Sequence, residues 1–392
     1  MLVLQDITIL AFEQAISAPF CTRQLADLGA RVIKVERPGE GDFARSYDTR
    51  VRGMASHFVW CNRSKESLTL NLKHPSASDV LDKLVSKADI IVQNLAPGSA
   101  ARLGLSWETL HPRFPGLIVC DISGYGSGGP LGSRKAYDLL IQSESGFLSI
   151  TGTASEYAKA GISIADISAG MYAFSGILAA LLRRRTTGFG EHIDISMLEC
   201  MAEWMGYPLY YTYEGAAPPD RTGATHATIY PYGPFVAGDG KAVLFGLQNE
   251  REWASFCEKV LRMPELAKES RFSSNSRRTE ARPELQEIID GVFSKLTASE
   301  VIGLLELAQI ANAQVNEMCD VWQHPQLHAR DRWASVETPV GAIPALLPPG
   351  TAMPGEVRMD PVPDLGANTD ALLTELGYSS DEIAVMRRDS VV

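Results

Sequence analysis

Paired cysteines are missing from this sequence, although it contains six cysteines in 392 residues. The six are spread along the chain, and no two of them form a CxxC pair. In a chain of this length, such spacing indicates reduced thiols rather than a disulfide framework or a cysteine-rich metal site. We therefore expect a cytoplasmic protein that binds no metal.

A signal peptide and long apolar runs are also lacking. The opening MLVLQDITILAF has neither the basic start nor the small-residue cleavage site of a signal peptide and is expected to form a first strand. The longest apolar stretch, near Ile177–Leu182, is far shorter than a membrane span. We expect no membrane partner.

Positive charge is in deficit, with 36 Lys and Arg against 47 Asp and Glu and a formal net charge of −11. This balance disfavours non-specific binding to nucleic acid. It remains compatible with an anionic small ligand in a local basic pocket. Repeats and low-complexity tracts are absent, and 45% of the residues are hydrophobic, as in ordinary globular proteins. Because the chain is longer than one core usually organises, we expect two domains.

The first 130 residues alternate between strand-like and helix-like segments. Helices are expected at about 18–28 and 80–87. Strands are expected at Ile7–Phe12, Arg31–Glu36, Asp89–Gln93 and Leu117–Ser123. This rhythm predicts an open α/β sheet of parallel strands, with the segments that follow those strands near a common ligand site.

A second region begins near Tyr230. It contains an expected hairpin around 238–240 and helices at about 252–261, 283–295 and 298–307. After Asn316 the chain becomes rich in proline, and this stretch could run back over the first domain as an extended connection. A closing helix is expected near Thr369–Leu376.

The most informative segment surrounds Asp166, which directly precedes an apolar helical stripe expected to be buried against the sheet. The stripe consists of Ile167, Met171, Phe174, Leu178 and Leu181. An Asp at this position commonly caps its helix by accepting hydrogen bonds from the first free N–H groups. Alternatively it is a nucleophile, because the helix N-terminus would keep it ionised and small neighbours such as Gly170 leave room for a ligand. Both interpretations stay open.

A glycine-rich loop at 124–132 follows an expected strand and fits GxGxxG as a bare pattern. Pro130 and Gly132 continue the loop where a phosphate-binding helix should begin, so a dinucleotide site is not supported. A loop that cradles a ligand and a plain surface loop are both compatible with this composition.

The chain resembles the family III CoA-transferases, the group that includes formyl-CoA, carnitine and bile-acid CoA-transferases and the α-methylacyl-CoA racemases. The resemblance extends over essentially the whole chain, and the order and spacing of its motifs are its most specific part. The motifs are Ala18-Pro-Phe-Cys-Thr22, Leu28–Arg37 with Gly41-Asp42, Asn94–Gly98 with Arg102 and Gly104, Ile122–Gly126, Lys135-Ala-Tyr-Asp138, the Asp166 helix and Gly188–Asp194.

This resemblance implies a large Rossmann-like domain built from both ends of the chain, a smaller α+β domain and an interlocked homodimer. The corresponding boundaries are 1–200 for the first part of the large domain, 201–229 for a linker, 230–315 for the small domain, and 316–392 for the return linker and the C-terminal part of the large domain.

The same resemblance implies that Asp166 is the catalytic aspartate and that coenzyme A or acyl-CoA is a substrate, with no tightly bound cofactor. The residues expected to contact CoA are Arg37, Leu70, Lys73, Asn94, Arg102, Lys135 and Tyr137. Cationic groups among them would suit the nucleotide phosphates, whereas Leu70 would pack on the adenine.

Two departures from the family pattern bear on the reaction. The formyl-CoA enzymes carry His-Val-Gln where this chain reads Gln14-Ala15-Ile16, so Gln14 is only a candidate substrate-binding residue. The racemases carry Gly-His-Asp where this chain reads Ala136-Tyr137-Asp138, and the missing His removes an acid/base partner. Transfer is therefore favoured over racemisation, and a non-enzymatic CoA-binding protein is a third alternative.

For the substrate, the resemblance indicates succinyl-CoA as donor and a C4–C5 dicarboxylic acid such as itaconate, mesaconate, citramalate or malate as acceptor. An alternative is intramolecular CoA transfer on mesaconyl-CoA. A second carboxylate favours an Arg partner. The candidates for contacting the substrate are Arg45, Arg52 and His226, and Arg221 lies near the last of these in the sequence.

Overall fold

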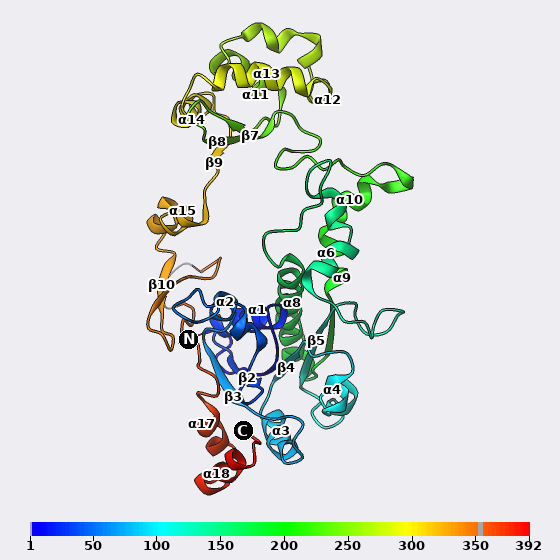
Figure 1. Ribbon diagram of the computed structural model, residues 1–392. Coiled ribbons are helices and arrows are strands. Elements are labelled where there is room, and N and C mark those ends of the chain that lie inside the picture. The colour runs from blue at the N-terminus through cyan, green and yellow to red at the C-terminus, as the bar shows by residue number, and fades with distance from the viewer. Residues whose placement is uncertain (1, 352–355) are drawn as a thin grey trace. The chain divides into compact units, whose positions relative to one another are not determined.

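The computed structural model describes residues 2–351 and 356–392 and divides into two compact units. Unit 1 comprises Met1–Ser145, Ala160–Gly206 and Gln326–Val392, so both ends of the chain contribute to it (blue and red in Figure 1). Unit 2 comprises Gly146–Lys159 and Tyr207–Pro325. The domain boundaries given above remain a prediction. They differ from this division in keeping 146–159 with the large domain, in treating 201–229 as a linker and in giving 316–325 to the returning chain.

A six-stranded parallel sheet forms the centre of unit 1, which confirms the expected open α/β sheet. Its spatial order is β3-β2-β1-β4-β5-β6. The strands are β1 (Thr8–Phe12), β2 (Arg31–Glu36), β3 (Lys65–Thr69), β4 (Ile90–Gln93), β5 (Ile118–Ser123) and β6 (His192–Ser196). The chain extends the sheet on one side of β1 and then crosses to β4 on the other, so the order reverses between β1 and β4. Ligands bind in such sheets at the carboxyl ends of the strands beside this reversal.

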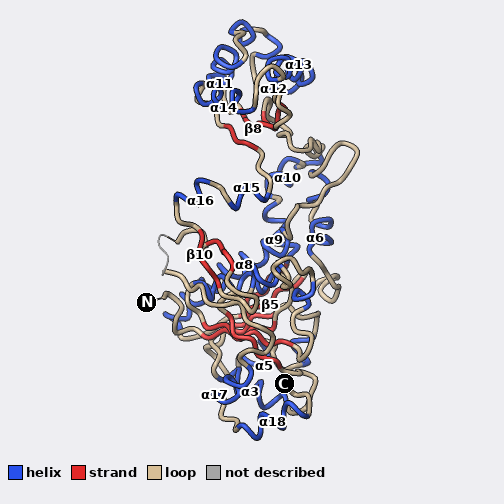
Figure 2. The backbone as a smooth tube through the Cα atoms, turned by 60° about the vertical axis from the view of Figure 1, so that its left-hand side comes forward, coloured by secondary structure: helices blue, strands red, loops and turns tan. Residues whose placement is uncertain are grey.

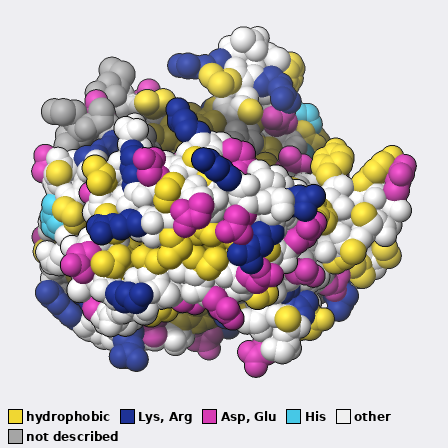
Figure 3. All heavy atoms as spheres, turned by 90° about the horizontal axis from the view of Figure 1, so that it is seen from above, with side chains coloured by type: hydrophobic (Ala, Val, Ile, Leu, Met, Phe, Trp, Pro, Cys, Tyr) yellow, Lys and Arg dark blue, Asp and Glu magenta, His cyan; other side chains and the backbone are white. Residues whose placement is uncertain are grey.

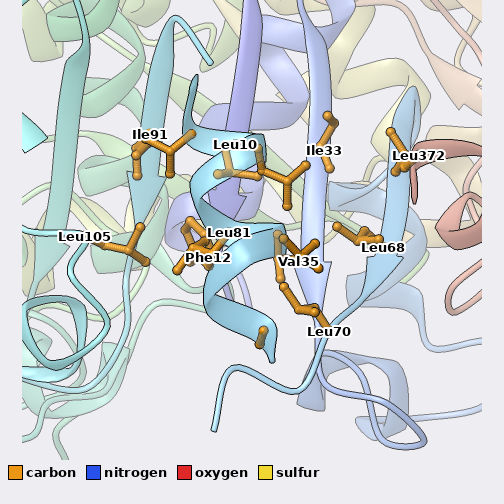
Figure 4. Packing of buried hydrophobic residues seen from close by; sticks show 14 of the residues in the cluster. Leu10, Phe12, Ile33, Val35, Leu68, Leu70, Leu81, Ile91, Leu105 and Leu372 are labelled. Atoms are coloured by element: carbon orange, nitrogen blue, oxygen red, sulfur yellow. The ribbon is translucent and has the colours of Figure 1, made fainter. Parts of the chain in front are cut away.

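Helices cover both faces of this sheet (Figure 1). On one face, α1 (Ser17–Asp27) packs along α8 (Ile164–Thr187), and α8 also contacts β5 and β6. The apolar core on the other face includes residues of α3 (Ala77–Ser86), α17 (Thr369–Glu375) and α18 (Ser380–Arg388). Side chains alternate along each strand, which explains why β2 sends Ile33 and Val35 into this core (Figure 4) and Lys34 to the opposite face.

Helix α8 buries mainly a different side from the one expected, and of the predicted stripe only Leu181 is buried. Met171 of the predicted stripe is 38% exposed, and Ile167, Phe174 and Leu178 are only partly buried. The fully buried positions are mostly small: Ala165, Ser168, Ala169, Gly170, Ala173, Ile177, Ala180 and Leu181. These small side chains let α8 lie close against α1. The prediction was wrong here because it took the most hydrophobic face of the helix to be the buried one. By length and composition α8 could also cross a membrane, but here it packs as a core helix.

The remaining elements of unit 1 are short. They are η1 (Phe43–Ser46), α2 (Ser56–Cys61), α4 (Ser99–Arg102), α5 (Trp107–Leu110), α6 (Asp138–Glu144), α9 (Met197–Trp204), α16 (Pro325–Ala329), β10 (Trp333–Val336) and β11 (Ile343–Leu346). The last two form an antiparallel pair. Beyond them the chain returns along β3, where the Asn368 N–H donates to the Ser67 carbonyl at 3.0 Å. This edge of the large sheet is therefore covered by the returning chain. The tube drawing shows α3, α17 and α18 together on one side of the large sheet (Figure 2).

Unit 2 contains a three-stranded sheet of order β7-β8-β9 and a set of helices. Its strands are β7 (Tyr232–Val236), β8 (Ala242–Gly246) and β9 (Asn312–Gln314), and its helices are α7 (Phe147–Ile150), α10 (Gly206–Tyr211, which starts in unit 1), η2 (Tyr213–Gly215), α11 (Glu250–Ser255), η3 (Phe256–Val260), η4 (Pro264–Lys268), η5 (Ser270–Phe272), α12 (Asn275–Glu280), α13 (Arg282–Phe293), α14 (Ala298–Leu307) and α15 (Met318–Trp322). Strands β7 and β8 pair antiparallel around 238–240, which confirms the expected hairpin. Aromatic side chains such as Phe235, Phe245 and Phe293 fill its core.

Charged side chains of both signs are mixed with hydrophobic ones on the face seen from above (Figure 3). In this view Lys and Arg lie interspersed with Asp and Glu and form no large basic patch. This face therefore offers no basic surface to which a polyanion such as nucleic acid would bind, in line with the formal net charge of −11.

Candidate active site

Asp166 lies in the first turn of α8, close enough to Ser17 that the side chain and backbone of Ser17 act to lower the pKa of the Asp166 carboxyl. Ser17 is the first residue of α1. The two helices are close because Gly170 lies one turn beyond Asp166: a Cβ at Gly170 would lie only 2.7 Å from the Ser17 carbonyl oxygen. Asp166 therefore faces the N-terminus of α1, a neighbouring helix, whose free N–H groups favour negative charge.

Asp138, the first residue of α6, caps α8 in place of Asp166. Its Oδ1 accepts the N–H groups of Ala165 at 2.8 Å and of Asp166 at 3.3 Å. Its Oδ2 accepts a 2.6 Å hydrogen bond from the buried Gln142 amide. The interpretation of Asp166 as the cap of its own helix is therefore wrong, since another carboxylate performs that task.

The electrostatic surroundings of Asp166 are unfavourable to its charge. Burial, followed by the nearby Asp138 carboxylate, raises the pKa of Asp166 to about 7, although Ser17 acts in the opposite direction. The expectation that the N-terminus of α8 keeps this group ionised is wrong, because Asp138 occupies the N–H groups concerned. A carboxylate with such a pKa is a stronger base and nucleophile than an ordinary Asp, and it ionises within the neutral range.

Two predicted residues meet where the strand order reverses. Asn94, directly after β4, accepts the Gln14 N–H at 2.8 Å and donates to the Gln14 carbonyl at 2.9 Å. The same Asn94 amide donates to the Ser17 hydroxyl oxygen at 3.1 Å. The Gln14 side chain accepts the Phe43 N–H at 3.1 Å. Both residues thus fix the loop that carries Ser17 to Asp166.

A fully buried charge network lies behind the same loop. Lys65 contacts Glu13 at 2.7 Å, and Lys34 lies between Glu13 at 3.3 Å and Asp42 at 2.7 Å. Although burial would raise it, the two lysines hold the pKa of Glu13 below its usual value. Asp42 also accepts the N–H of Ala15, a non-glycine residue at φ +60°. The network therefore holds a strained stretch of backbone that leads into Ser17.

The arginines expected near the substrate are placed differently from one another. Arg45 forms two hydrogen bonds with the buried Glu36 carboxylate, at 2.9 and 2.7 Å, and lies 3.8 Å from the Phe58 ring centroid. Its guanidinium is thus engaged in unit 1. Arg52 is exposed, with a single 3.4 Å hydrogen bond to the Val340 carbonyl.

Two further candidates belong to unit 2. Arg221 donates to the carbonyls of Thr153 and Ala154 at 2.8 and 3.0 Å, so it fixes a loop of its own unit. The His226 Nδ1 accepts the N–H groups of Thr228 and Ile229, at 3.2 and 3.1 Å. This arrangement leaves Nε2 as the protonated nitrogen of the neutral ring.

Most residues expected to contact CoA are exposed near the carboxyl ends of the strands. The exposed ones are Arg37, Lys73, Arg102, Lys135 and Tyr137. Leu70 is only 1% exposed and belongs to the core beside α3 (Figure 4), which leaves almost none of its surface for an adenine ring. The role of each of these residues in CoA binding remains a prediction.

The glycine-rich loop uses its donors internally. The Gly126 N–H donates to the Ser123 hydroxyl at 2.9 Å, and the Ser127 N–H donates to Asp194 at 2.8 Å. A Cβ at Gly124 would lie 2.2 Å from the Ala136 Cβ, so this glycine permits close packing of two chain segments. These contacts favour the surface-loop interpretation.

Three residues of the site were not singled out from the sequence: Ser17, Asp138 and Tyr47. Ser17 had a signal, because it begins the helix that follows a strand at the reversal of the sheet. Tyr47 had none. Burial, then the charges of Asp42 and Asp166 and the nearby Tyr137, raise the pKa of Tyr47 to about 12.

In the described ranges, 2–351 and 356–392, no group of three His, Cys, Asp or Glu residues could hold a metal ion.

The fold agrees with the comparison to known families: CoA-transferase family III matches residues 4–369, and the chain belongs to that family. It is 32% identical to the succinyl-CoA:glutarate CoA-transferase of Homo sapiens, over 99% of this chain and 90% of the human protein. It is 30% identical to the succinate–glutarate CoA-transferase of Agrobacterium fabrum, over 95% of each chain. The succinyl-CoA:mesaconate CoA-transferase of Haloarcula marismortui is 32% identical over 86% of each chain.

Solved structures agree with this assignment. A CaiB/BaiF family protein from Brucella suis superposes with a TM-score of 0.84 at 30% identity, covering 96% of this chain and 99% of that one. The protein is therefore a family III CoA-transferase, whose substrates are CoA thioesters and carboxylic acids.

Proposed function

We propose that this CoA-transferase moves coenzyme A from succinyl-CoA to a C4–C5 dicarboxylic acid, with Asp166 as the nucleophile. The supporting observation is the Asp166 carboxylate itself, which is held at the start of α1, is not used to cap its own helix, and has a pKa raised to about 7. The substrate class is supported by the names of the relatives, which include transferases for glutarate, mesaconate, malate and citramalate.

The proposed reaction proceeds through covalent intermediates. An Asp166 oxygen attacks the thioester carbon of succinyl-CoA, the C–S bond breaks, and a mixed anhydride and CoA thiolate form. The thiolate attacks the Asp166 carbonyl carbon and displaces succinate, which gives an aspartyl-CoA thioester. The acceptor carboxylate then attacks the same carbon and displaces the thiolate. Finally the thiolate attacks the acceptor's acyl carbon, and the new acyl-CoA leaves Asp166 as a carboxylate again.

Among the dicarboxylates, we place glutarate beside mesaconate and itaconate as the acceptors to test first. The experiment is to incubate the protein with succinyl-CoA and each acid separately, with acetate as the monocarboxylate control, and to follow new acyl-CoA by mass spectrometry. A dicarboxylyl-CoA product with little acetyl-CoA is the expected result. Equal transfer to acetate would contradict the dicarboxylate assignment.

We also propose a homodimer, and we retain the cytoplasmic location as a prediction. The support for a dimer is a set of large apolar side chains on unit 1 that the single chain leaves at least 38% exposed. These are Leu139, Leu140, Met171, Leu182, Phe189 and Trp204. Light scattering is expected to give twice the 42.6 kDa of one chain, and a monomer mass at micromolar concentration would contradict this proposal.

A further inference from the structure

The side chain of Gln142 is fully buried and connects two segments beside Asp166. Gln142 lies on α6 and is 0% exposed. Its Nε2 donates to the Asp138 Oδ2 at 2.6 Å, and its Oε1 accepts the N–H of Ala160 at 2.9 Å. A carboxylate offers only acceptors and a backbone N–H only a donor, so the two partners together fix the orientation of this amide.

The carboxylate of Asp138 divides its two oxygens between Gln142 and α8. Its Oδ1 accepts the N–H groups of Ala165 at 2.8 Å and of Asp166 at 3.3 Å. Ser163, at the N-cap position of α8, makes no side-chain capping hydrogen bond. The first turn of α8 therefore depends on Asp138 for its cap, and Gln142 holds the other oxygen of that cap.

The contact with Ala160 fixes the chain just before α8. The chain leaves unit 1 after Ser145, passes through Gly146–Lys159 in unit 2, and re-enters unit 1 at Ala160. Because Gln142 lies shortly before this departure, its amide ties the returning chain to the helix from which that chain departed. The two hydrogen bonds of one side chain thus place both the approach to α8 and the cap of its first turn.

We propose that Gln142 is a positioning residue of the transfer reaction: by holding the Asp138 carboxylate and the Ala160 N–H, it fixes the first turn of α8 and with it the backbone of Asp166. This inference rests on the proposed function, because Asp166 is the nucleophile named there. Gln142 acts through Asp138 and Ala160 and takes no part in the making or breaking of bonds.

A fixed first turn matters because attack on a thioester requires a carboxylate oxygen about 3–3.5 Å from the acyl carbon. Residues at a helix terminus fray most readily, since their N–H groups lack partners within the helix. Without the Gln142 amide, the Asp138 Oδ2 is left without this donor, and the carboxylate can turn toward another one. The hydrogen bonds to the first turn of α8 then weaken, and Asp166 spends less time in the geometry that reacts.

The first test needs no substrate. Amide hydrogen exchange in the segment 160–168 is measured by mass spectrometry in the wild-type protein and in Gln142→Met, which keeps the length and approximate volume of the side chain. Exchange is expected to become about 10-fold faster, because the first N–H groups of α8 lose their oriented acceptor. Asn368→Leu is the matched control: it also removes a side-chain amide of unit 1, one that accepts the Ser67 N–H at 2.9 Å, and it is expected to leave this segment unchanged.

The second test is the exchange of CoA between succinyl-CoA and ¹³C-labelled succinate in the full-length protein, well below the melting temperature of each variant. Gln142→Met is expected to lower kcat by roughly 10- to 100-fold and to keep KM for succinyl-CoA within about twofold of the wild-type value. Asn368→Leu is expected to keep both values. In an Asp138→Ala background, where the cap is already lost, Gln142→Met is expected to lower kcat by less than about threefold.

Faster amide exchange at the start of α8 together with a lower kcat supports the inference. Unchanged amide exchange or a wild-type kcat in Gln142→Met would overturn it, and so would equal losses of kcat in the wild-type and Asp138→Ala backgrounds. If Gln142→Met does not fold, Gln142→Asn replaces it, because the shorter amide cannot reach both partners, and the same outcomes apply. Absence of CoA transfer in the wild-type protein would overturn the proposed function and this inference with it, whatever the amide exchange shows.

Discussion

Of the groups of charged side chains inside unit 1, two are built in opposite ways. Behind the loop after β1, Glu13 and Asp42 are matched by Lys34 and Lys65, so each buried charge has a counter-charge. Beside α1, Asp166 has as its charged neighbour another carboxylate, Asp138, and the groups that favour its charge are the uncharged side chain and backbone of Ser17.

The difference indicates a structural role for the paired charges and fits the reactive role proposed for Asp166. A paired buried charge is stable and unreactive, because ionisation and hydrogen bonding are both satisfied. A carboxylate beside a like charge is ready to lose its negative charge, as the proposed acylation of Asp166 requires. The paired network fixes the loop at Ala15, and that loop places Ser17 against the unpaired Asp166.

The largest expected effect is that of Asp166→Asn, which removes the unpaired carboxylate. Transfer is expected to fall on the order of 10⁴-fold or more, because the amide cannot form the anhydride. The fold is expected to gain stability at the same time. The raised pKa means that folded Asp166 holds a proton which the unfolded chain releases between about pH 4 and 7, so its ionisation lowers stability as pH rises through that window.

Thermal unfolding checks this sign. The variant is expected to melt about 3 °C above the wild type at pH 8 and at the wild-type temperature at pH 4. A lower melting temperature at pH 8 would show that Asp166 is a paired scaffold charge like Glu13, and would break the comparison.

Removing a charge from the paired network is expected to lower stability, whereas Asp166→Asn is expected to raise it. Glu13→Gln leaves Lys65 without an anionic partner and Lys34 with Asp42 alone. We expect a loss of roughly 3 kcal/mol in the free energy of unfolding by urea. Glu66→Gln is the control, since Glu66 pairs with Arg31 at the surface, and its loss is expected to stay below about 1 kcal/mol. Equal losses for the two variants would remove the distinction.

The two arginines of the dicarboxylate hypothesis, Arg45 and Arg52, are expected to differ in the same way: one substitution lowers stability and the other changes substrate preference. Arg45→Ala exposes the buried Glu36 without its partner and is expected to cost about 2 kcal/mol of stability and to reduce transfer to all acids alike. Arg52→Ala is expected to leave the melting temperature unchanged and to weaken use of dicarboxylates more than use of acetate. Transfer rates of both variants with glutarate and with acetate distinguish these effects. An equal loss of transfer to the two acids in Arg52→Ala would exclude Arg52 as the partner of the second carboxylate.

The smallest expected effect concerns Asp138. Asp138→Asn keeps an oxygen that accepts the α8 N–H groups but removes the like charge beside Asp166. The acid limb of kcat/KM, which we place near pH 7 in the wild type, is expected to move to lower pH by roughly half a unit. Glu144→Gln on the same helix is the control, because Glu144 pairs with Arg134. A limb that moves upward would contradict the assigned repulsion.

The sequence was most informative where local pattern and burial agree. Strands at 31–36 and 90–93 and the helix at 298–307 are where periodicity placed them, because β-branched residues and regular apolar spacing specify them. Strand β3 was not predicted, since its charged residues Lys65 and Glu66 are untypical of a buried strand; in the structure Lys65 is buried and pairs with Glu13.

The sequence singled out Asp166 as the candidate nucleophile, which remains a prediction, and gave no indication of the residues around it. Asp166 was identified through its motif and its place before a helix. The residues that shift its pKa, Asp138 and Ser17, are 28 and 149 residues away in the chain and are brought near it by packing of α1, α6 and α8. No local spacing encodes such a contact, and for the same reason the small buried face of α8 was missed.

The most direct test of the unpaired carboxylate is to find the covalent bond. The protein is incubated with succinyl-CoA, quenched with hydroxylamine, digested, and the peptide containing Asp166 is weighed by mass spectrometry. A hydroxamate on Asp166 that forms only when succinyl-CoA is present is the predicted result. An unmodified Asp166 in a sample that is turning over succinyl-CoA would contradict the account.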